Sequence, residues 1–261
     1  MLKYISLCAK LMKISLVLPC YNEETNLQKG VLDKIGNFVK DDNRFIEVLI
    51  VDDGSTDNSR QIIEEKYLSK FPKFKLITSL HHGKAFSVIT GIKKAQGNFV
   101  MFSDVDLATP IEEAQKLING AREGFPIVIG SRQARREGAP LARKIMAKGG
   151  IIIRNLFIGL KGIQDSQCGF KLFDKKASLN IIKHLQVYDD HPQISGPSVS
   201  AGFDIEFLFV GLKLGYKIKE IPVTWKHVET RRVNFFKDSF ESFRDILTIG
   251  YLAFRKKYDQ D

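Results

Sequence analysis

One stretch organises the chain: Phe99-Val100-Met101-Phe102-Ser103-Asp104-Val105-Asp106. It begins with aromatic and β-branched residues and contains no Gly or Pro, which predicts a buried strand. Side chains at i and i+2 of a strand point the same way, so Asp104 and Asp106 can share one ligand. Close carboxylates repel each other unless a cation lies between them, and Mg²⁺ or Mn²⁺ accepts such oxygen ligands. A solvated strand end with capping aspartates is the alternative interpretation, because a lone D-x-D is common.

The rest of the first half alternates between apolar runs and segments with helical spacing. Further buried strands are predicted at 14–19, 46–51, 74–79 and 127–131. Helices are predicted at 25–39, 58–67, 84–95 and 111–120. Strands that alternate with helices form a mostly parallel, Rossmann-like sheet with helices on both faces. We therefore expect an α/β fold.

Polar residues gather where these predicted strands end. Ligands of parallel sheets lie outside the carboxyl ends of the strands. The sequence has no G-x-G-x-x-G, no P-loop and no G-x-S-x-G motif, so those nucleotide and nucleophile sites are excluded. Carboxylates can instead accept hydrogen bonds from a base and a ribose while a metal neutralises a diphosphate. The residues that we expect at this edge are Glu23, Asp52, Asp53, Asp104, Asp106 and Arg132.

The overall charge indicates which partners to expect. The 261 residues carry a net charge of +10, which favours anionic partners. No basic stretch with interleaved aromatics and no zinc finger occurs, so we expect no nucleic acid. Cys8, Cys20 and Cys168 form no C-x-x-C pair, which argues against a zinc site or a disulfide framework and fits a reducing compartment.

The N-terminal residues and the hydropathy indicate where the protein acts. Residues 1–10 are too short and too interrupted by lysine for a signal peptide, and Met12 is an alternative start. No stretch approaches the ~18–20 uncharged apolar residues of a spanning helix. We therefore expect a protein that is soluble or lies on a membrane, and that does not cross one.

The second half mixes basic and apolar residues. Arginines and lysines alternate with apolar residues over 132–158, which fits either a surface for a membrane or a lipid phosphate, or a solvated helix with a core face. A short strand is predicted near 170–173, helices at 175–184 and from 202, and a strand at 218–223. The segment 235–254 carries an apolar stripe that fits a core helix, the commoner case, or a membrane-surface helix.

Two further features keep alternative interpretations. Asp204 and Glu206 stand in the first turn of the helix predicted from 202, where acids suit the helix dipole. His81 and His82 precede Gly83-Lys84 in a loop that we expect near the nucleotide. A histidine pair in a loop is more often solvated than bound to a metal, so no metal site is predicted there.

Short motifs follow one another along nearly the whole chain. They are Leu18-Pro19-Cys20-Tyr21-Asn22-Glu23-Glu24, Val51-Asp52-Asp53-Gly54-Ser55-Thr56-Asp57, Gly83-Lys84, Asp104-Val105-Asp106 and Gly130-Ser131-Arg132. Together they resemble the inverting, GT-A-fold glycosyltransferases of family 2. Three later motifs resemble the dolichyl-phosphate β-glucosyltransferases and their bacterial polyprenyl-phosphate relatives within that family. They are Gln167-Cys168-Gly169-Phe170-Lys171-Leu172-Phe173, Phe203-Asp204-Ile205-Glu206 and Ile221-Pro222-Val223-Thr224-Trp225.

The resemblance implies roles for individual residues. Asp104 and Asp106 would bind the metal and the diphosphate, and with Arg132 and Asp204 they form the implied catalytic set. The implied nucleotide-binding residues are Pro19, Tyr21, Glu23, Asp52, Asp53, Lys84 and Asp104. The implied acceptor-phosphate residues are Arg132, Arg143 and Lys148.

The chain departs from the resembled family at two places. Ala108 occupies a position at which some polyprenyl-phosphate mannosyltransferases add a third metal ligand, which implies a thinner metal shell here. We expect the hydrophobic N-terminal anchor of the eukaryotic glucosyltransferases to be absent here or reduced to residues 1–13.

The resemblance also implies an activity, namely metal-dependent, inverting transfer of a hexose from a nucleotide sugar to a polyprenyl or dolichyl phosphate. Glucose from UDP-glucose is the first expectation. A lipid phosphate is largely ionised near neutral pH, its second pKa being about 6, so it needs no strong general base. Three alternatives stay open: GDP-mannose as the donor, a saccharide hydroxyl as the acceptor with Asp204 as the base, and a basic binding module that has lost catalysis.

We expect one domain over 1–261. Residues 13–131 would form the nucleotide-sugar half, 132–234 the acceptor half and 235–261 a C-terminal amphipathic helix. The expected partners are the nucleotide-sugar donor, the lipid phosphate and an anionic membrane surface. A second copy of the chain or a membrane protein is also compatible with the sequence as a partner.

Overall fold

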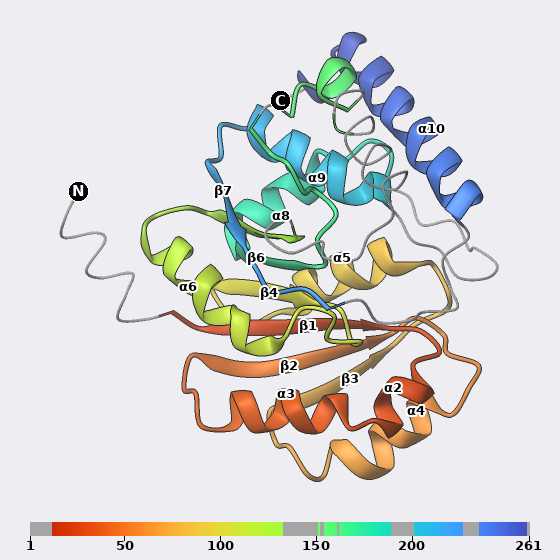
Figure 1. The fold of residues 1–261 in the computed structure, drawn as a ribbon, viewed down its shortest axis with the longest axis vertical. Helices are drawn as coiled ribbons and strands as arrows, with labels where there is room; N and C mark the ends of the chain where they lie inside the picture. Colours follow the sequence, from red (N-terminus) through yellow and green to blue (C-terminus); the bar gives the residue numbers. More distant parts are fainter. Residues whose placement is uncertain are drawn as a thin grey trace.

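The computed structural model describes residues 12–132, 151, 154–160, 162–188, 201–226 and 235–259. Within these residues, a seven-stranded sheet runs through the molecule in the order β3-β2-β1-β4-β6-β5-β7 (Figure 1). The strands are β1 (Ile14–Cys20), β2 (Phe45–Asp52), β3 (Phe74–Thr78), β4 (Phe99–Ser103), β5 (Ile127–Ser131), β6 (Phe170–Asp174) and β7 (Ile218–Pro222).

The sheet is parallel except at one strand. β1 lies parallel between β2 and β4, β3 is parallel to β2, and β7 is parallel to β5. β6 is antiparallel and lies between β4 and β5. Because β6 runs the other way, its first residue, Phe170, pairs with the last residue of β4, Ser103. The residues just before β6 therefore lie beside the carboxyl end of β4.

Helices cover both faces of this sheet (Figure 1). Residues of β1 alternate between two cores, as a strand buried on both faces requires. Leu16 and Leu18 belong to the core that includes α3, η1 and α6, whereas Val17 belongs to the core that includes α5, α8, α9 and α10. The helices are α2 (Glu24–Gln28), α3 (Val31–Lys40), α4 (Ser59–Ile62), the π-helix η1 (Ile63–Tyr67), α5 (Lys84–Lys94), the 3₁₀-helix η2 (Ile111–Glu113), α6 (Ala114–Arg122), α8 (Lys175–Lys183), α9 (Ala201–Lys213), α10 (Phe235–Phe254) and the 3₁₀-helix η4 (Lys257–Asp259).

Two predicted helices differ from the structure. The segment 25–39 is split into α2 and α3 because Gly30 has a φ of 74°, a left-handed value that ends one helix and begins the next. The segment 58–67 begins as α4 and continues as the π-helix η1. The strands predicted at 14–19, 46–51, 74–79, 127–131 and 218–223 are confirmed to within one residue. The strand predicted from Phe99 ends at Ser103, so Asp104 and Asp106 follow β4 and do not share one face of a strand.

The second half of the chain contributes β6 and β7 to the same sheet as the first half. The predicted nucleotide and acceptor halves therefore share one framework. Among the described residues, no helix combines the length and the apolar character that crossing a bilayer requires.

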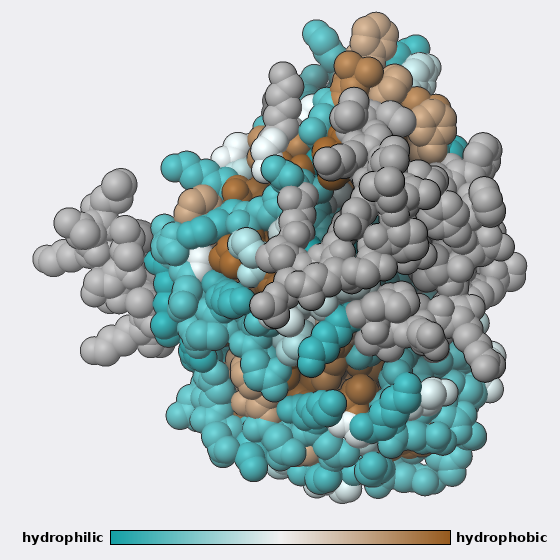
Figure 2. All heavy atoms as spheres, viewed as in Figure 1, coloured by the Kyte–Doolittle hydropathy of each residue, from teal (hydrophilic) through white to brown (hydrophobic). Residues whose placement is uncertain are grey.

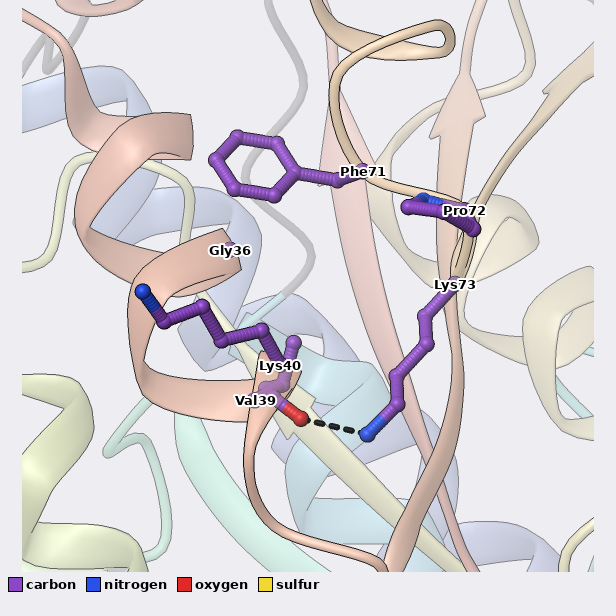
Figure 3. A pocket seen from close by; sticks show the side chains of 6 residues that line it. All are labelled: Gly36, Val39, Lys40, Phe71, Pro72 and Lys73. Atoms are coloured by element: carbon purple, nitrogen blue, oxygen red, sulfur yellow. Dashed lines mark hydrogen bonds between the residues drawn. The ribbon is translucent and has the colours of Figure 1, made fainter.

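A small cavity lies between α3 and the segment that leads into β3 (Figure 3). Its lining is mostly apolar, and the Lys73 ammonium donates to the Val39 carbonyl at 2.5 Å. The cavity lies at the amino ends of β2 and β3, away from the edge at which the polar residues gather, so we assign it no ligand. Its lining residues are Gly36, Val39, Lys40, Phe71, Pro72 and Lys73.

Candidate active site

The loops that follow β1 and β2 are joined by side-chain hydrogen bonds. The Asn22 Oδ1 accepts from the Thr56 amide at 2.7 Å, and the Asn22 amide donates to the Ser55 hydroxyl at 2.9 Å. Asn22 has a φ of 53°, which Asn tolerates better than most residues. The Glu23 amide donates to the Ser59 hydroxyl at 2.7 Å. These contacts join the loops after β1 and β2 into one surface, which we call the wall of the site.

Asp52 and Asp53 are both buried and both organise loops. Asp52 accepts from the Ser55 amide at 3.1 Å and from the Arg60 guanidinium at 2.7 Å. Asp53 accepts from the Gly83 amide at 2.7 Å and from the His82 amide at 2.9 Å. Both carboxylates thus shape the wall of the site, and their assignment to nucleotide binding stays a prediction.

His81 is ordered against the same wall. Its Nδ1 lies 2.7 Å from Asp53 Oδ2, and its ring stacks on that of Tyr21 with centroids 4.0 Å apart and planes at 9°. Its side chain is only 15% exposed, so His81 is packed, unlike the solvated loop histidine that we expected. Pro19, Tyr21 and Glu23, predicted to contact the nucleotide, are half-buried nearby in β1 and the loop after it.

Lys84 lies among the carboxylates that the sequence singled out. Its Nζ is 2.5 Å from Asp104 Oδ1. Burial would lower the pKa of Lys84, but Asp104, Asp204 and Asp106 outweigh it and raise that pKa. Lys84 therefore stays charged, and the three acids share its positive charge. The structure thus brings together Asp104 and Asp106 of β4's end, Asp204 of α9 and Lys84 of α5.

Asp106 belongs to a tight turn after β4. Its Oδ1 accepts from the Ala108 amide at 2.9 Å. Leu107 between them has a φ of 52°, which is uncommon for a large side chain. The turn keeps Asp106 half-exposed beside Asp104 rather than extending the strand.

Gly169 makes room for Asp104, and the sequence motif gave no indication of this role. The Asp104 amide donates to the Gly169 carbonyl at 3.1 Å. A Cβ on Gly169 would come within 2.8 Å of Asp104 Oδ1 and closer still to Oδ2. The carboxylate of Asp104 therefore lies directly over the Cα of Gly169, in space that any other residue would fill.

Lys171 is a buried cation that the sequence analysis did not single out. Its Nζ donates to the Cys168 carbonyl at 2.5 Å and to Asp204 at 2.8 Å, and lies 5.4 Å from the ring centroid of Phe102. Its side chain is 2% exposed. Lys171 is the second residue of β6 and stands between apolar neighbours. Its contact with Asp204 becomes visible only once β6 is placed beside β4.

We expect Lys171→Met to destabilise the protein. Removing one partner of a buried ion pair leaves the other charge uncompensated, which costs about 3 kcal/mol. Denaturant unfolding should show this loss, and Lys171→Met combined with Asp204→Asn should recover at least half of it. A single variant as stable as the parent protein would show that the Lys171–Asp204 pair does not support the fold.

Arg132 is held by Asp165 rather than projecting into solvent. Its Nε and Nη2 donate to the two oxygens of Asp165, each at 2.7 Å. Burial would lower the pKa of Arg132, but Asp165 outweighs it, and the guanidinium stays charged. Glu220 in turn accepts from the Asp165 amide at 2.8 Å. Arg132 stands at the end of β5 as predicted, and its role toward an acceptor phosphate stays a prediction. Arg143 and Lys148 lie outside the described residues.

Glu206 of α9 is buried, and its contacts are not those of a helix dipole. Its Oε1 accepts from the Gln186 and Val187 amides at 2.7 and 2.9 Å and from the Tyr258 hydroxyl at 2.7 Å. Within the described part of the chain, its Oε2 has no hydrogen-bond partner. Burial raises the pKa of Glu206 above its ordinary value near 4.5, although these hydrogen bonds oppose the shift. Glu206 ties the C-terminal end of the chain to α9.

We expect Glu206→Gln to change the pH dependence of stability. Because the pKa is raised in the folded state, the folded protein keeps this proton at pH values where the unfolded chain has lost it. The free energy of unfolding therefore falls as pH rises above about 4.5. Glutamine removes this term, so the stability of the variant relative to the parent should increase between acidic and neutral pH. Urea unfolding across that range measures the difference, and a constant difference would contradict the assignment.

The donor set fits a hard divalent cation. Asp104 and Asp106 offer carboxylate oxygens, and the contact of the Lys84 ammonium with Asp104 shows that a positive charge is accommodated beside them. In the residues that the structure describes, no group of three or more His, Cys, Asp or Glu side chains could hold a metal. Two carboxylates suit Mg²⁺ or Mn²⁺, whose remaining positions water and phosphates can fill, and do not suit structural zinc.

The family follows from comparison with known proteins. The model of the family described as "Glycosyl transferase family 2" matches residues 15–181, which include β1 to β6 and the wall, Lys84, Asp104 and Lys171. The chain belongs to glycosyl transferase family 2. This confirms the resemblance predicted from the motifs and makes the protein a glycosyltransferase.

The relatives of this glycosyltransferase cover most of its length. It is 27% identical to the dolichyl-phosphate beta-glucosyltransferase of Saccharomyces cerevisiae over 90% of this chain and 73% of that protein. It is 29% identical to the Homo sapiens enzyme of the same name over 91% of this chain and 74% of that protein.

Solved structures confirm the GT-A fold. Glucosyl-3-phosphoglycerate synthase of Mycobacterium tuberculosis, in complex with Mn²⁺, UDP-glucose and phosphoglyceric acid, superposes with a TM-score of 0.67. The match covers 96% of this chain and 84% of that one at 16% sequence identity. At that identity the likeness shows the fold alone.

Proposed function

We propose that this glycosyltransferase transfers glucose from UDP-glucose to a dolichyl or polyprenyl phosphate, with a bound Mg²⁺ or Mn²⁺ and inversion at the anomeric carbon. The observation that carries the proposal is the group formed by Asp104, Asp106, Lys84 and Arg132 at the carboxyl edge of the sheet. The relatives named dolichyl-phosphate beta-glucosyltransferase support the sugar and the lipid acceptor.

The wall after β1 and β2 provides the nucleotide end of the site. Tyr21, stacked on His81, offers an aromatic face for a base, and Glu23 offers a carboxylate for donors of a base or ribose. Asp53 acts indirectly, because it fixes the loop that carries Lys84. Lys84 then lies where a diphosphate would approach. Its ammonium, which contacts Asp104 in the structure, would pair with the phosphates instead.

Asp104 and Asp106 would hold the metal ion. When bound, such an ion supplies positive charge that stabilises a departing nucleoside diphosphate. The residues of the chain orient the donor around it, since Gly169 fixes Asp104 and the turn at Leu107 fixes Asp106.

The acceptor end of the site carries arginine. Arg132 is oriented by Asp165, and a guanidinium in fixed orientation suits a phosphate oxygen. Arg143 and Lys148 are proposed for the same phosphate from the sequence. Because a lipid phosphate is already an oxyanion near neutral pH, positioning and charge compensation suffice, and no base is required.

A saccharide hydroxyl as the acceptor is the second candidate, because Asp204 faces the site and could serve as its base. Lys171 donates to Asp204 at 2.8 Å, so this carboxylate is already engaged by a buried cation. With a lipid phosphate as the acceptor, the Lys171–Asp204 pair can stay intact, because no proton has to be transferred. The contact therefore favours the phosphate acceptor.

We place the enzyme on the cytosolic face of a membrane, where a nucleotide sugar and a lipid phosphate can meet. A screen of labelled UDP-glucose, GDP-mannose and UDP-N-acetylglucosamine against dolichyl phosphate and against a soluble oligosaccharide tests donor and acceptor together. Label from UDP-glucose alone in the dolichyl phosphate arm is the expected result. Label only in the oligosaccharide arm, with loss in Asp204→Asn, would replace this proposal by the second candidate.

A further inference from the structure

The helix α10 carries two apolar faces. Ile246 and Ile249 are buried and belong to the core under α9, as expected for a core helix. Large apolar side chains also occur on the other side, where they are exposed. They recur at intervals of four, four and three residues, which places them along one side of the helix. These outer residues, with their exposed fractions, are Phe243 (42%), Leu247 (39%), Tyr251 (59%) and Phe254 (85%).

A second segment extends this outer side. A Cβ on Gly250 would lie 3.2 Å from the carbonyl oxygen of Phe157, so the chain at Phe157 passes directly against α10. Phe157 is 48% exposed and its neighbour Leu156 is 78% exposed. We call the six side chains the α10 outer face: Leu156, Phe157, Phe243, Leu247, Tyr251 and Phe254. Figure 2 shows brown and tan spheres gathered over α10 at the top of the view.

This concentration is unusual for a water-exposed surface. The described part of the chain exposes eight large hydrophobic side chains, and six of them belong to the α10 outer face. Single exposed apolar residues are normal, but a contiguous group of this kind marks an interaction site.

Basic residues border the α10 outer face. Arg244 is exposed on α10 and pairs with Asp245 at 3.3 Å, and Arg255, Lys256 and Lys257 follow the end of α10 in exposed positions. The Arg255 guanidinium lies 5.9 Å from the ring centroid of Tyr251, so cation and aromatic ring are presented together. The acid at the end of η4, Asp259, is paired with Lys213. Among the side chains that the structure describes here, basic residues therefore outnumber acidic ones, because Asp245 and Asp259 are each paired with a cation.

We propose that the α10 outer face docks this enzyme on an anionic lipid bilayer. A helix with exposed aromatic and leucine side chains and a border of lysine and arginine suits the boundary between headgroups and acyl chains. A second copy of the chain fits less well, because a two-fold contact would bring the same basic residues of both copies together. The purpose of this docking rests on the proposed function, in which the acceptor is a membrane lipid, but binding to a bilayer requires no turnover.

Vesicle sedimentation tests the docking. The probes are vesicles of phosphatidylcholine alone and of phosphatidylcholine with phosphatidylserine. Leu247→Ser with Phe254→Ser should lower the partition of the full chain into vesicles by about tenfold or more, because two apolar side chains that would enter the bilayer are lost. Lys256→Glu with Lys257→Glu should cause a similar loss on anionic vesicles and a much smaller one on neutral vesicles.

Matched controls separate this face from general stickiness and general charge. Leu212→Ser changes an exposed leucine of α9, and Lys93→Glu with Lys94→Glu changes exposed lysines of α5. Both should bind vesicles within about twofold of the parent protein, because neither lies on the face. If the control variants lost as much vesicle binding as the variants of the α10 outer face, the proposal would be overturned. A dimer in lipid-free buffer that dissociates on Leu247→Ser with Phe254→Ser would also overturn it.

Transfer to a detergent-solubilised lipid phosphate distinguishes this inference from the proposed function. The face variants should transfer sugar at the parent rate in detergent, where the enzyme need not find a bilayer. A parent protein that binds vesicles through the face but transfers no sugar would contradict the proposed function and support the docking. A parent protein that transfers sugar but does not bind anionic vesicles would contradict the docking alone.

Discussion

Asp104→Asn should lower the rate of sugar transfer by about 10³-fold or more while the protein stays folded. The carboxylate is expected to contribute charge to a divalent cation at the point where the diphosphate leaves, and a metal ion contributes several kcal/mol to such a step. The Lys84–Asp104 pair is partly exposed, with side chains 31% and 35% accessible, so its loss should cost at most about 1 kcal/mol of stability. Transfer rates and urea unfolding of the purified variant measure the two effects.

Asp42→Asn is the matched control for Asp104→Asn. Asp42 also pairs with a cation, Arg44 at 2.6 Å, but at the amino end of β2. The control should keep the parent transfer rate with a similar or larger loss of stability. If both variants transferred sugar at the parent rate, Asp104 would have no role in the reaction.

Gly169→Ala should lower the transfer rate by about 10²-fold, because misplacing a catalytic group by about 1 Å has an effect of that size. The added methyl group would overlap both carboxylate oxygens of Asp104, and the Gly169 backbone is tied to Asp104 by a hydrogen bond of 3.1 Å. The carboxylate must then move, which disturbs its contact with Lys84. The Mn²⁺ concentration that gives half the maximal rate should also rise. A defect that only lowers stability would not change it.

Gly36→Ala is the matched control for Gly169→Ala. Its methyl group would lie 2.5 Å from the ring of Phe71, so it also crowds a side chain. It does so in the cavity between α3 and the segment before β3, where the ring has room to shift (Figure 3). We expect lower stability with an unchanged rate and an unchanged Mn²⁺ response. Gly169→Ala with a normal rate and Mn²⁺ response would show that Asp104 needs no such fixed position.

The sequence predicted the elements that depend on local patterns. Buried strands appear in the sequence as apolar runs. The carboxylates that follow these runs lie at one edge of the sheet, because the carboxyl ends of parallel strands meet there. Family membership followed from the order of the motifs. The split at Gly30 was missed because the apolar spacing continues across it, and only its left-handed φ of 74° ends α2.

The contacts that β6 creates could not be predicted from local patterns. β6 is inserted antiparallel between β4 and β5, which brings Gly169 against Asp104 and Lys171 against Asp204. Nothing in the spacing of Gly169 or Lys171 indicates a pairing with residues more than thirty positions away. Similarly, Asp52 and Asp53 read as ligands, whereas their hydrogen bonds show that they also build the loops of the site.

The outer side of α10 was beyond sequence reasoning for a different reason. Apolar residues occur all around its second half, so the pattern fitted a core helix, the commoner case, and also a membrane-surface helix. The structure resolves this by burying Ile246 and Ile249 and leaving Leu247 and Phe254 exposed. α10 is therefore both a core helix and an exposed apolar surface.

Transfer of label from UDP-[¹⁴C]glucose to dolichyl phosphate, followed by extraction into organic solvent, tests the proposed reaction in one step. With Mn²⁺ present we expect the label in the organic phase, released as glucose by mild acid, and we expect EDTA to abolish its formation. The Asp104→Asn enzyme should give no extractable label. Organic-phase label that is undiminished by EDTA and by Asp104→Asn, or none with the parent enzyme, would contradict the assignment of this edge as a metal-dependent glucosyl-transfer site.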